Sequence, residues 1–162
     1  MLNDNAAAAF QSNIDGLNTL RLTGQTIFIP IYLSWLARTY AKLGKFDDAW
    51  RCIGEAVTAI ETRKETWCEA EVNRIAGEIA LRSPADLLKP QAYFERALAV
   101  ARKQQAKSWE LRAAMSLARL WRDQGKPQQA RELLAPVYGW FTEGFDTRDL
   151  KEAKALLDEL AT

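Results

Sequence analysis

One stretch of the chain, Leu36–Trp50, reads LARTYAKLGKFDDAW, and a second, Leu117–Arg131, reads LARLWRDQGKPQQAR. Leucine, alanine, arginine, glycine, lysine and alanine recur at matching places, and Tyr40 corresponds to Trp121. An internal repeat of this kind predicts one supersecondary unit built several times, each unit burying its apolar face against its neighbour. The chain is therefore expected to fold as a stack of similar units.

A weaker third copy lies between these two, which makes the repeat period about 40 residues. The first segments of the three units align as Leu33-x-x-Leu36-Ala37-x-x-Tyr40, Val72-x-x-Ile75-Ala76-x-x-Ile79 and Ala114-x-x-Leu117-Ala118-x-x-Trp121. The second segments align as Ala49-x-x-x-Ile53-x-x-Ala56, Pro90-x-x-x-Phe94-x-x-Ala97 and Ala130-x-x-x-Leu134-x-x-Val137.

The composition and periodicity of the chain predict helices throughout. Alanine, leucine, glutamate, lysine, arginine and glutamine dominate, and apolar residues recur at three- and four-residue spacing. Glycine and proline separate these periodic segments and indicate helix breaks. The expected helices span residues 4–22, 27–43, 46–62, 67–82, 88–104, 107–124, 127–141 and 147–160. Pro136 is expected to kink the seventh, and Asp146 or Thr147 to cap the eighth.

Each repeated position has a mechanical reason. The alanine of each first helix allows the second helix to approach closely, and the large residue three positions later packs against that helix. Gly44 and Gly125 can adopt the left-handed conformation that ends a helix and reverses the chain.

This pattern resembles the tetratricopeptide repeat, whose signature is Trp-x2-Leu-Gly-x2-Tyr followed by Ala-x3-Phe-x2-Ala. The resemblance implies an all-α, tetratricopeptide-like α-solenoid, in which about three antiparallel helix pairs with flanking helices form a right-handed superhelix. The expected single domain, 1–162, divides into a half-repeat helix (1–24), three repeats (27–63, 67–104 and 107–142) and a capping helix (146–160).

The long period resembles the repeats of bacterial regulators of the maltose-activator type. The segment from AYFERALAV to KALLDEL also resembles the C-terminal repeat region of bacterial proteins that carry adenylate or guanylate cyclase and ATPase domains. No GxxxxGK[ST] phosphate loop occurs, so ATP binding by that route is not expected.

The composition argues against several kinds of function. The chain has no histidine, which removes the commonest general base and metal ligand, and only Cys52 and Cys68 could supply thiolates. We expect no disulfide between these cysteines, no cofactor and no metal ion. The formal net charge is +1, and no apolar run is long enough to span a bilayer, so neither nucleic acid nor membrane is expected as a partner. The expected location is a bacterial cytoplasm.

The resemblance implies that the first helices line a concave groove that holds a peptide or a partner helix. Arginine dominates the positions expected to face this groove, and arginine captures carboxylates in a bidentate manner. We therefore expect an acidic peptide or protein surface as partner. The alternative is a solvated face with salt bridges to Glu69, Glu71 and Glu78. The expected groove residues are Ser34, Arg38, Lys42, Asn73, Gly77, Arg112, Met115, Arg119 and Arg122.

The chain is thus expected to be a non-enzymatic protein–protein interaction scaffold. One alternative is a regulatory fragment that docks on a cyclase or ATPase domain. Another is a homo-oligomer formed through the N-terminal helix, whose Phe10, Ile14 and Leu17 would be uncovered. Three tryptophans at repeated positions, Trp67, Trp109 and Trp121, are expected to pack in the core. One tryptophan among Trp35, Trp50 and Trp140 is expected to be exposed.

Overall fold

A computed structural model describes residues 4–83 and 89–161, apart from the side chains of residues 4–7 and 9. The described residues form eight α-helices and no β-strand. In chain order the helices are α1 (Asp4–Leu22), α2 (Ile29–Lys42), α3 (Phe46–Arg63), α4 (Glu69–Arg82), α5 (Pro90–Lys103), α6 (Lys107–Asp123), α7 (Pro127–Tyr138) and α8 (Arg148–Glu159).

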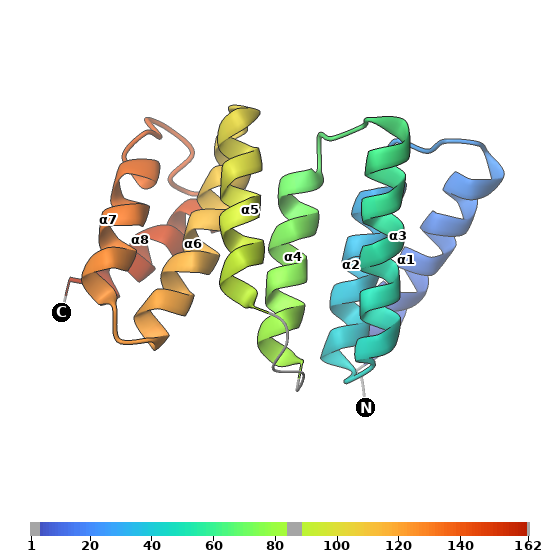
Figure 1. Cartoon of the computed structure of the whole chain (residues 1–162), viewed down its shortest axis with the longest axis horizontal. Helices are drawn as coiled ribbons and strands as arrows, with labels where there is room; N and C mark the ends of the chain where they lie inside the picture. The colour runs from blue at the N-terminus through green and yellow to red at the C-terminus, as the bar shows by residue number, and fades with distance from the viewer. Residues whose placement is uncertain (1–3, 84–88, 162) are drawn as a thin grey trace.

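The helices stand side by side in two layers (Figure 1), and the expected α-solenoid is confirmed. In one layer α2 packs on α4, α4 on α6 and α6 on α8, whereas the backbones of α3, α5 and α7 lie further apart, and α3 meets α5 through the rings of Trp50 and Tyr93, with centroids 5.8 Å apart. The second helices instead pack on the first helices before and after them. The layer of first helices, whose members lie closest together, is therefore the concave side of the stack.

The small residues at the repeated positions make this close stacking possible. Ala37, Ala76 and Ala118 are completely or almost completely buried in the first helices, and Ala49 and Ala130 are completely buried in the second helices. An alanine leaves room for a neighbouring backbone where a larger side chain would force the helices apart. The burial of these alanines is consistent with the mechanical role assigned to them.

The two copies of the opening motif end their first helices with the same turn. Gly44 and Gly125 both have φ +74, in the left-handed region. In each turn the amide after the glycine reaches back along the helix: Lys45 N donates to Tyr40 O at 3.0 Å, and Lys126 N donates to Trp121 O at 2.8 Å. These are the bonds of a Schellman motif, which satisfies carbonyls that the helix end leaves without partners.

The first and last described helices, α1 and α8, cover the two ends of the stack. At one end, Leu17 of α1 is buried, and the ring of Phe10 meets Tyr40 of α2 edge-on with centroids 5.3 Å apart. At the other end, α8 buries Leu150, Ala153 and Leu156 against the preceding pair, as does Leu160 directly after it, while the outer face of α8 carries charged residues. Such polar outer faces keep the terminal units of a solenoid from stacking on further units.

Two expected details of the later helices can be compared with the structure. Pro136 lies inside α7, and this helix ends at Tyr138 rather than at 141. Thr147 occupies the cap position of α8, but its hydroxyl donates to Gly144 O at 2.7 Å instead of capping the helix. None of the described helices has the length and apolar character needed to cross a bilayer.

Candidate functional site

An open groove of about 710 Å³ runs along the concave side, bounded by α2, α4, α6 and the start of α8. Its walls are mostly charged, with arginines and carboxylates alternating. The lining residues are Trp35, Arg38, Glu71, Arg74, Glu78, Arg112, Met115, Ser116, Arg119, Thr147, Arg148, Asp149 and Glu152. Four expected groove residues, Arg38, Arg112, Met115 and Arg119, are among them.

Three other expected groove residues do not reach the groove surface. Ser34 is fully buried, and its hydroxyl donates to Ile31 O at 2.8 Å. The side-chain amide of Asn73 donates to Glu69 O at 2.8 Å, and this residue is also buried. Gly77 packs against the ring of Phe94 on α5. The sequence spacing placed these residues on the correct helices, but these small residues are buried within the stack.

The arginines of α6 are paired with carboxylates of α8. Arg112 Nε lies 2.6 Å from Asp149 Oδ2, and Arg119 Nη2 lies 3.0 Å from Glu152 Oε2. Arg122 contacts Glu159 at 2.5 Å and also its own neighbour Asp123. The salt-bridged arrangement considered from the sequence is therefore present for these arginines, but its acidic partners come from α8.

A buried ion-pair cluster lies at the centre of the concave side. Arg74 donates to both carboxylate oxygens of Glu71, at 2.7 and 2.8 Å, and it also bonds Glu78 on the same helix. A further contact of 3.3 Å to Ser116 Oγ joins α4 to α6. Burial alone would lower the pKa of Arg74, but the bonds to Glu71 and Glu78 outweigh it and raise the pKa. The cluster therefore keeps a permanent charge inside the stack.

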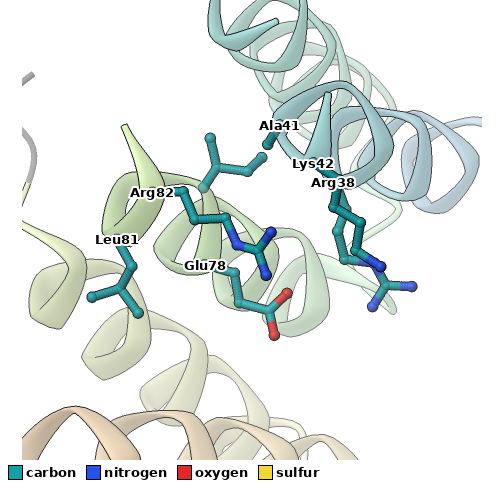
Figure 2. A pocket seen from close by; sticks show the side chains of 7 residues that line it. Arg38, Ala41, Lys42, Glu78, Leu81 and Arg82 are labelled. Atoms are coloured by element: carbon teal, nitrogen blue, oxygen red, sulfur yellow. The ribbon is translucent and has the colours of Figure 1, made fainter. Parts of the chain in front are cut away.

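A smaller pocket of about 300 Å³ lies beside this groove, where α2 and α4 end. Arg38 and Lys42 come from α2, Glu78 and Arg82 come from α4, and Ala41, Ile79 and Leu81 complete the lining. In Figure 2 the side chains of Arg82 and Glu78 extend from α4 toward the space beside Arg38 and Lys42. Among the described residues, Arg38, Lys42 and Arg82 form no ion pair, because Glu78 pairs with Arg74.

The sequence did not single out Arg82 or Arg74 as groove residues. Arg82 lies three positions beyond Ile79, where the aligned first-helix pattern ends, so its repeat equivalents gave no signal. The burial of Arg74 depends on Glu71 and Ser116, which only the packing of α4 on α6 brings together.

The two thiols offer little nucleophilic chemistry. Cys52 and Cys68 are free and buried. Burial raises the pKa of both thiols, that of Cys68 to about 12. In the part of the chain that the structure describes, no group of three or more cysteine, aspartate or glutamate residues is placed to hold a metal ion.

The stacked helix pairs place the chain in the class of helical-repeat proteins. The family model described as tetratricopeptide repeat matches residues 30–53 and 111–136, which lie in α2–α3 and α6–α7. These matches support a tetratricopeptide repeat protein, and they fall on the two copies of the motif that the sequence pattern identifies most clearly. No curated protein matches the chain significantly.

Proposed function

We propose that this chain is a non-enzymatic protein–protein interaction scaffold whose concave side binds an acidic peptide or protein surface. The observation that carries the proposal is the cluster of Arg38, Lys42 and Arg82, which share one pocket and form no ion pair among the described residues. The carboxylate that also lines this pocket, Glu78, is already paired with Arg74. Tetratricopeptide repeats are generally protein-interaction modules, and the matched segments include Arg38 and Lys42.

The charges of the concave side favour binding of an acidic ligand at the ends of α2 and α4 over binding beside α6 and α8. Around α6 and α8, Arg112 and Arg119 already have carboxylate partners. An acidic ligand there would have to displace an existing ion pair, and it would gain little net energy. At the ends of α2 and α4, a carboxylate adds a partner to unpaired cations, which favours binding and fast association at low salt.

Fluorescence anisotropy with a labelled glutamate-rich peptide and its glutamine-substituted counterpart tests this proposal. We expect the glutamate peptide to bind more tightly, and its affinity to fall as the salt concentration rises. The Arg38→Glu/Arg82→Glu double variant should weaken binding at least about tenfold, which corresponds to about 1.4 kcal/mol. Equal binding of both peptides, or unchanged affinity of the double variant, would refute the acidic preference.

A matched control separates local from global charge effects. Arg131 is exposed on α7, outside both pockets, and forms no ion pair among the described residues. Arg131→Glu changes the net charge in the same direction as each groove substitution, and it should leave peptide affinity nearly unchanged. A loss of affinity as large as that of the groove variants would show that only the net charge matters.

The two alternatives from the sequence have different support. Docking on a cyclase or ATPase domain rests on the resemblance of the C-terminal segment alone, whereas a cytoplasmic location rests on the two separate cysteines. Homo-oligomerisation through α1 loses its main argument, because Leu17 is buried and Phe10 and Ile14 pack against the core beside α2. Light scattering of the purified chain tests that alternative. A stable dimer would support homo-oligomerisation, and a monomer would argue against it.

A further inference from the structure

Exposed apolar side chains gather in the turns that lead from one helix pair to the next. In these turns Ile27, Phe28, Trp67, Trp140 and Phe145 are each more than a third exposed. Trp67 was expected in the core, yet 37% of its surface is exposed. These turns lie at the opposite edge of the stack from the ends of α2 and α4 (Figure 1), so this edge is separate from the pocket of Arg38 and Arg82.

A pocket of about 530 Å³ lies where three segments of this edge meet. Ile27, Trp67 and Ala106 form its apolar walls, and Glu65, Thr66 and Gln104 add polar groups. Hydrogen bonds join each of these segments to the next one along the chain. Trp67 Nε1 donates to Ile27 O at 3.1 Å, and Gln104 Nε2 donates to Thr66 O at 2.8 Å.

These bonds hold the indole ring of Trp67 in place. Its N–H is used by Ile27, and Phe28 meets the ring edge-on with centroids 5.8 Å apart. An immobilised indole that is still partly exposed needs no ordering when a ligand stacks on it, which lowers the entropic cost of binding. Indole faces also attract cations more strongly than other aromatic side chains do.

The carboxylate of Glu65 lacks a partner. Its Oε2 atom is buried and has no hydrogen-bond partner among the described residues. Leaving a buried acceptor unsatisfied destabilises the protein, and more so when the group is charged. An aromatic wall beside an unpaired carboxylate is complementary to a cation that carries its own donors.

We propose that this pocket binds an arginine side chain of a partner protein. The guanidinium pairs with the carboxylate of Glu65, a partly exposed residue of the lining, and stacks against Trp67, while the aliphatic stem of the arginine covers Ile27. A guanidinium suits the pocket better than an ammonium, because it is planar, weakly hydrated and able to stack and donate at once. The inference is independent of the concave-side proposal, since it uses other residues and the opposite ligand charge.

The binding of N-acetyl-L-arginine methyl ester can be followed by NMR, using the backbone amide signals of Thr66 and Ala106 as reporters. The citrulline analogue has nearly the same shape without the charge, and it serves as the matched ligand. We expect the arginine ester to shift both signals in a saturable way, and the citrulline ester to bind at least about tenfold more weakly, the equivalent of about 1.4 kcal/mol.

Two variants assign the effect to the pocket. Glu65→Gln keeps the shape of the side chain and removes its charge, and Trp67→Leu keeps an apolar wall and removes the indole face. Each should reduce affinity for the arginine ester several-fold. Glu61→Gln removes an exposed charge from α3 outside the pocket and should have no effect.

The possible results are distinct. No saturable shift, equal shifts with arginine and citrulline esters, or unchanged binding by Glu65→Gln would each overturn the proposal. Should Trp67→Leu lose the native signal dispersion, the conservative Glu65→Gln variant still decides the outcome. None of these results bears on peptide binding at Arg38 and Arg82.

Discussion

Arg112 on α6 donates through Nε to Asp149 Oδ2 on α8 at 2.6 Å. The same guanidinium lies over the ring of Trp109, 5.0 Å from its centroid. A residue expected to select a partner thus holds the last helix on the stack. One turn later in α8, Glu152 forms a second ion pair with α6, through Arg119.

The substitution Arg112→Gln should lower the free energy of unfolding by about 1 kcal/mol or less. The side chains of Arg112 and Asp149 are 38% and 31% exposed, so solvent screens their ion pair, and the stacking on Trp109 adds a comparable small amount. Urea denaturation followed by circular dichroism measures the change. Arg131→Gln, at an exposed and unpaired position, should be neutral; equal losses for the two variants would contradict the role given to Arg112.

The packing of α4 on α5 depends on Gly77. A Cβ atom at this position would lie 2.4 Å from Cε1 of Phe94, so Gly77→Ala forces the ring to move. We expect a loss of about 1–3 kcal/mol from overpacking, even though alanine favours helix more than glycine does.

Gly54 on α3 is the matched control for this substitution, because nothing lies within 4 Å of a Cβ atom there. Gly54→Ala should therefore stabilise the protein by roughly 0.5–1 kcal/mol. Thermal or urea denaturation of both variants gives the comparison. A stabilising Gly77→Ala would mean that Phe94 has more freedom than its contacts indicate.

The buried cluster of Arg74 and Glu71 predicts a strongly non-additive pair of substitutions. Arg74→Met leaves the Glu71 carboxylate buried without its cation, which should cost about 3–5 kcal/mol. The double variant Glu71→Leu/Arg74→Met removes both charges, and it should recover at least half of that loss. Chemical denaturation of the single and double variants forms the cycle, and simple additivity would argue against direct coupling of the two charges.

The stability of the protein should depend on Glu110 at acid pH. Burial raises the pKa of this carboxyl, but hydrogen bonds from Lys107 and Arg102, at 2.7 and 3.0 Å, outweigh it and lower the pKa. The unfolded chain therefore takes up the proton at higher pH than the folded chain. The stabilisation is complete well above pH 4.5, the ordinary value, and is lost as the pH falls through the folded pKa.

Unfolding of the wild type and Glu110→Gln at a series of pH values checks this dependence. The wild type should be more stable near neutral pH, and the difference should shrink below the ordinary glutamate pKa. Glu132→Gln, an exposed position on α7 without an ion pair among the described residues, should show no such convergence. A difference in the free energy of unfolding that stays the same at every pH would show that Glu110 does not contribute to the acid dependence.

The interpretation of the tryptophans shows where repeat patterns lose accuracy. Trp121 is partly buried and packs against the core as expected, whereas Trp109 is only partly buried and Trp67 is 37% exposed, although all three occupy repeated positions. Trp140, a less specified position, is 57% exposed, and the expectation of one exposed tryptophan is confirmed. A repeated position shows which helix face a residue occupies, but the exposed fraction also depends on the neighbouring turn.

The sequence by itself determined the helices, their breaks and the stacking of pairs. Ala37, Tyr40, Gly44 and Ala49 specify these features within one turn and two helices, and the physical constraints there are local: side-chain volume, helix periodicity and a left-handed turn. The same constraints recur in the copy at Leu117–Arg131, so the pattern could be recognised twice.

Only the tertiary structure decided which charges remain free. Arg38 and Arg119 occupy equivalent positions in two repeats, yet Arg119 pairs with Glu152 of α8, whereas Arg38 has no ion-pair partner among the described residues. The pairing depends on which helix lies next in the stack and how it is rotated, so distant segments set it. Electrostatic interactions fall off with distance and depend on burial, and neither quantity can be read from spacing along one chain.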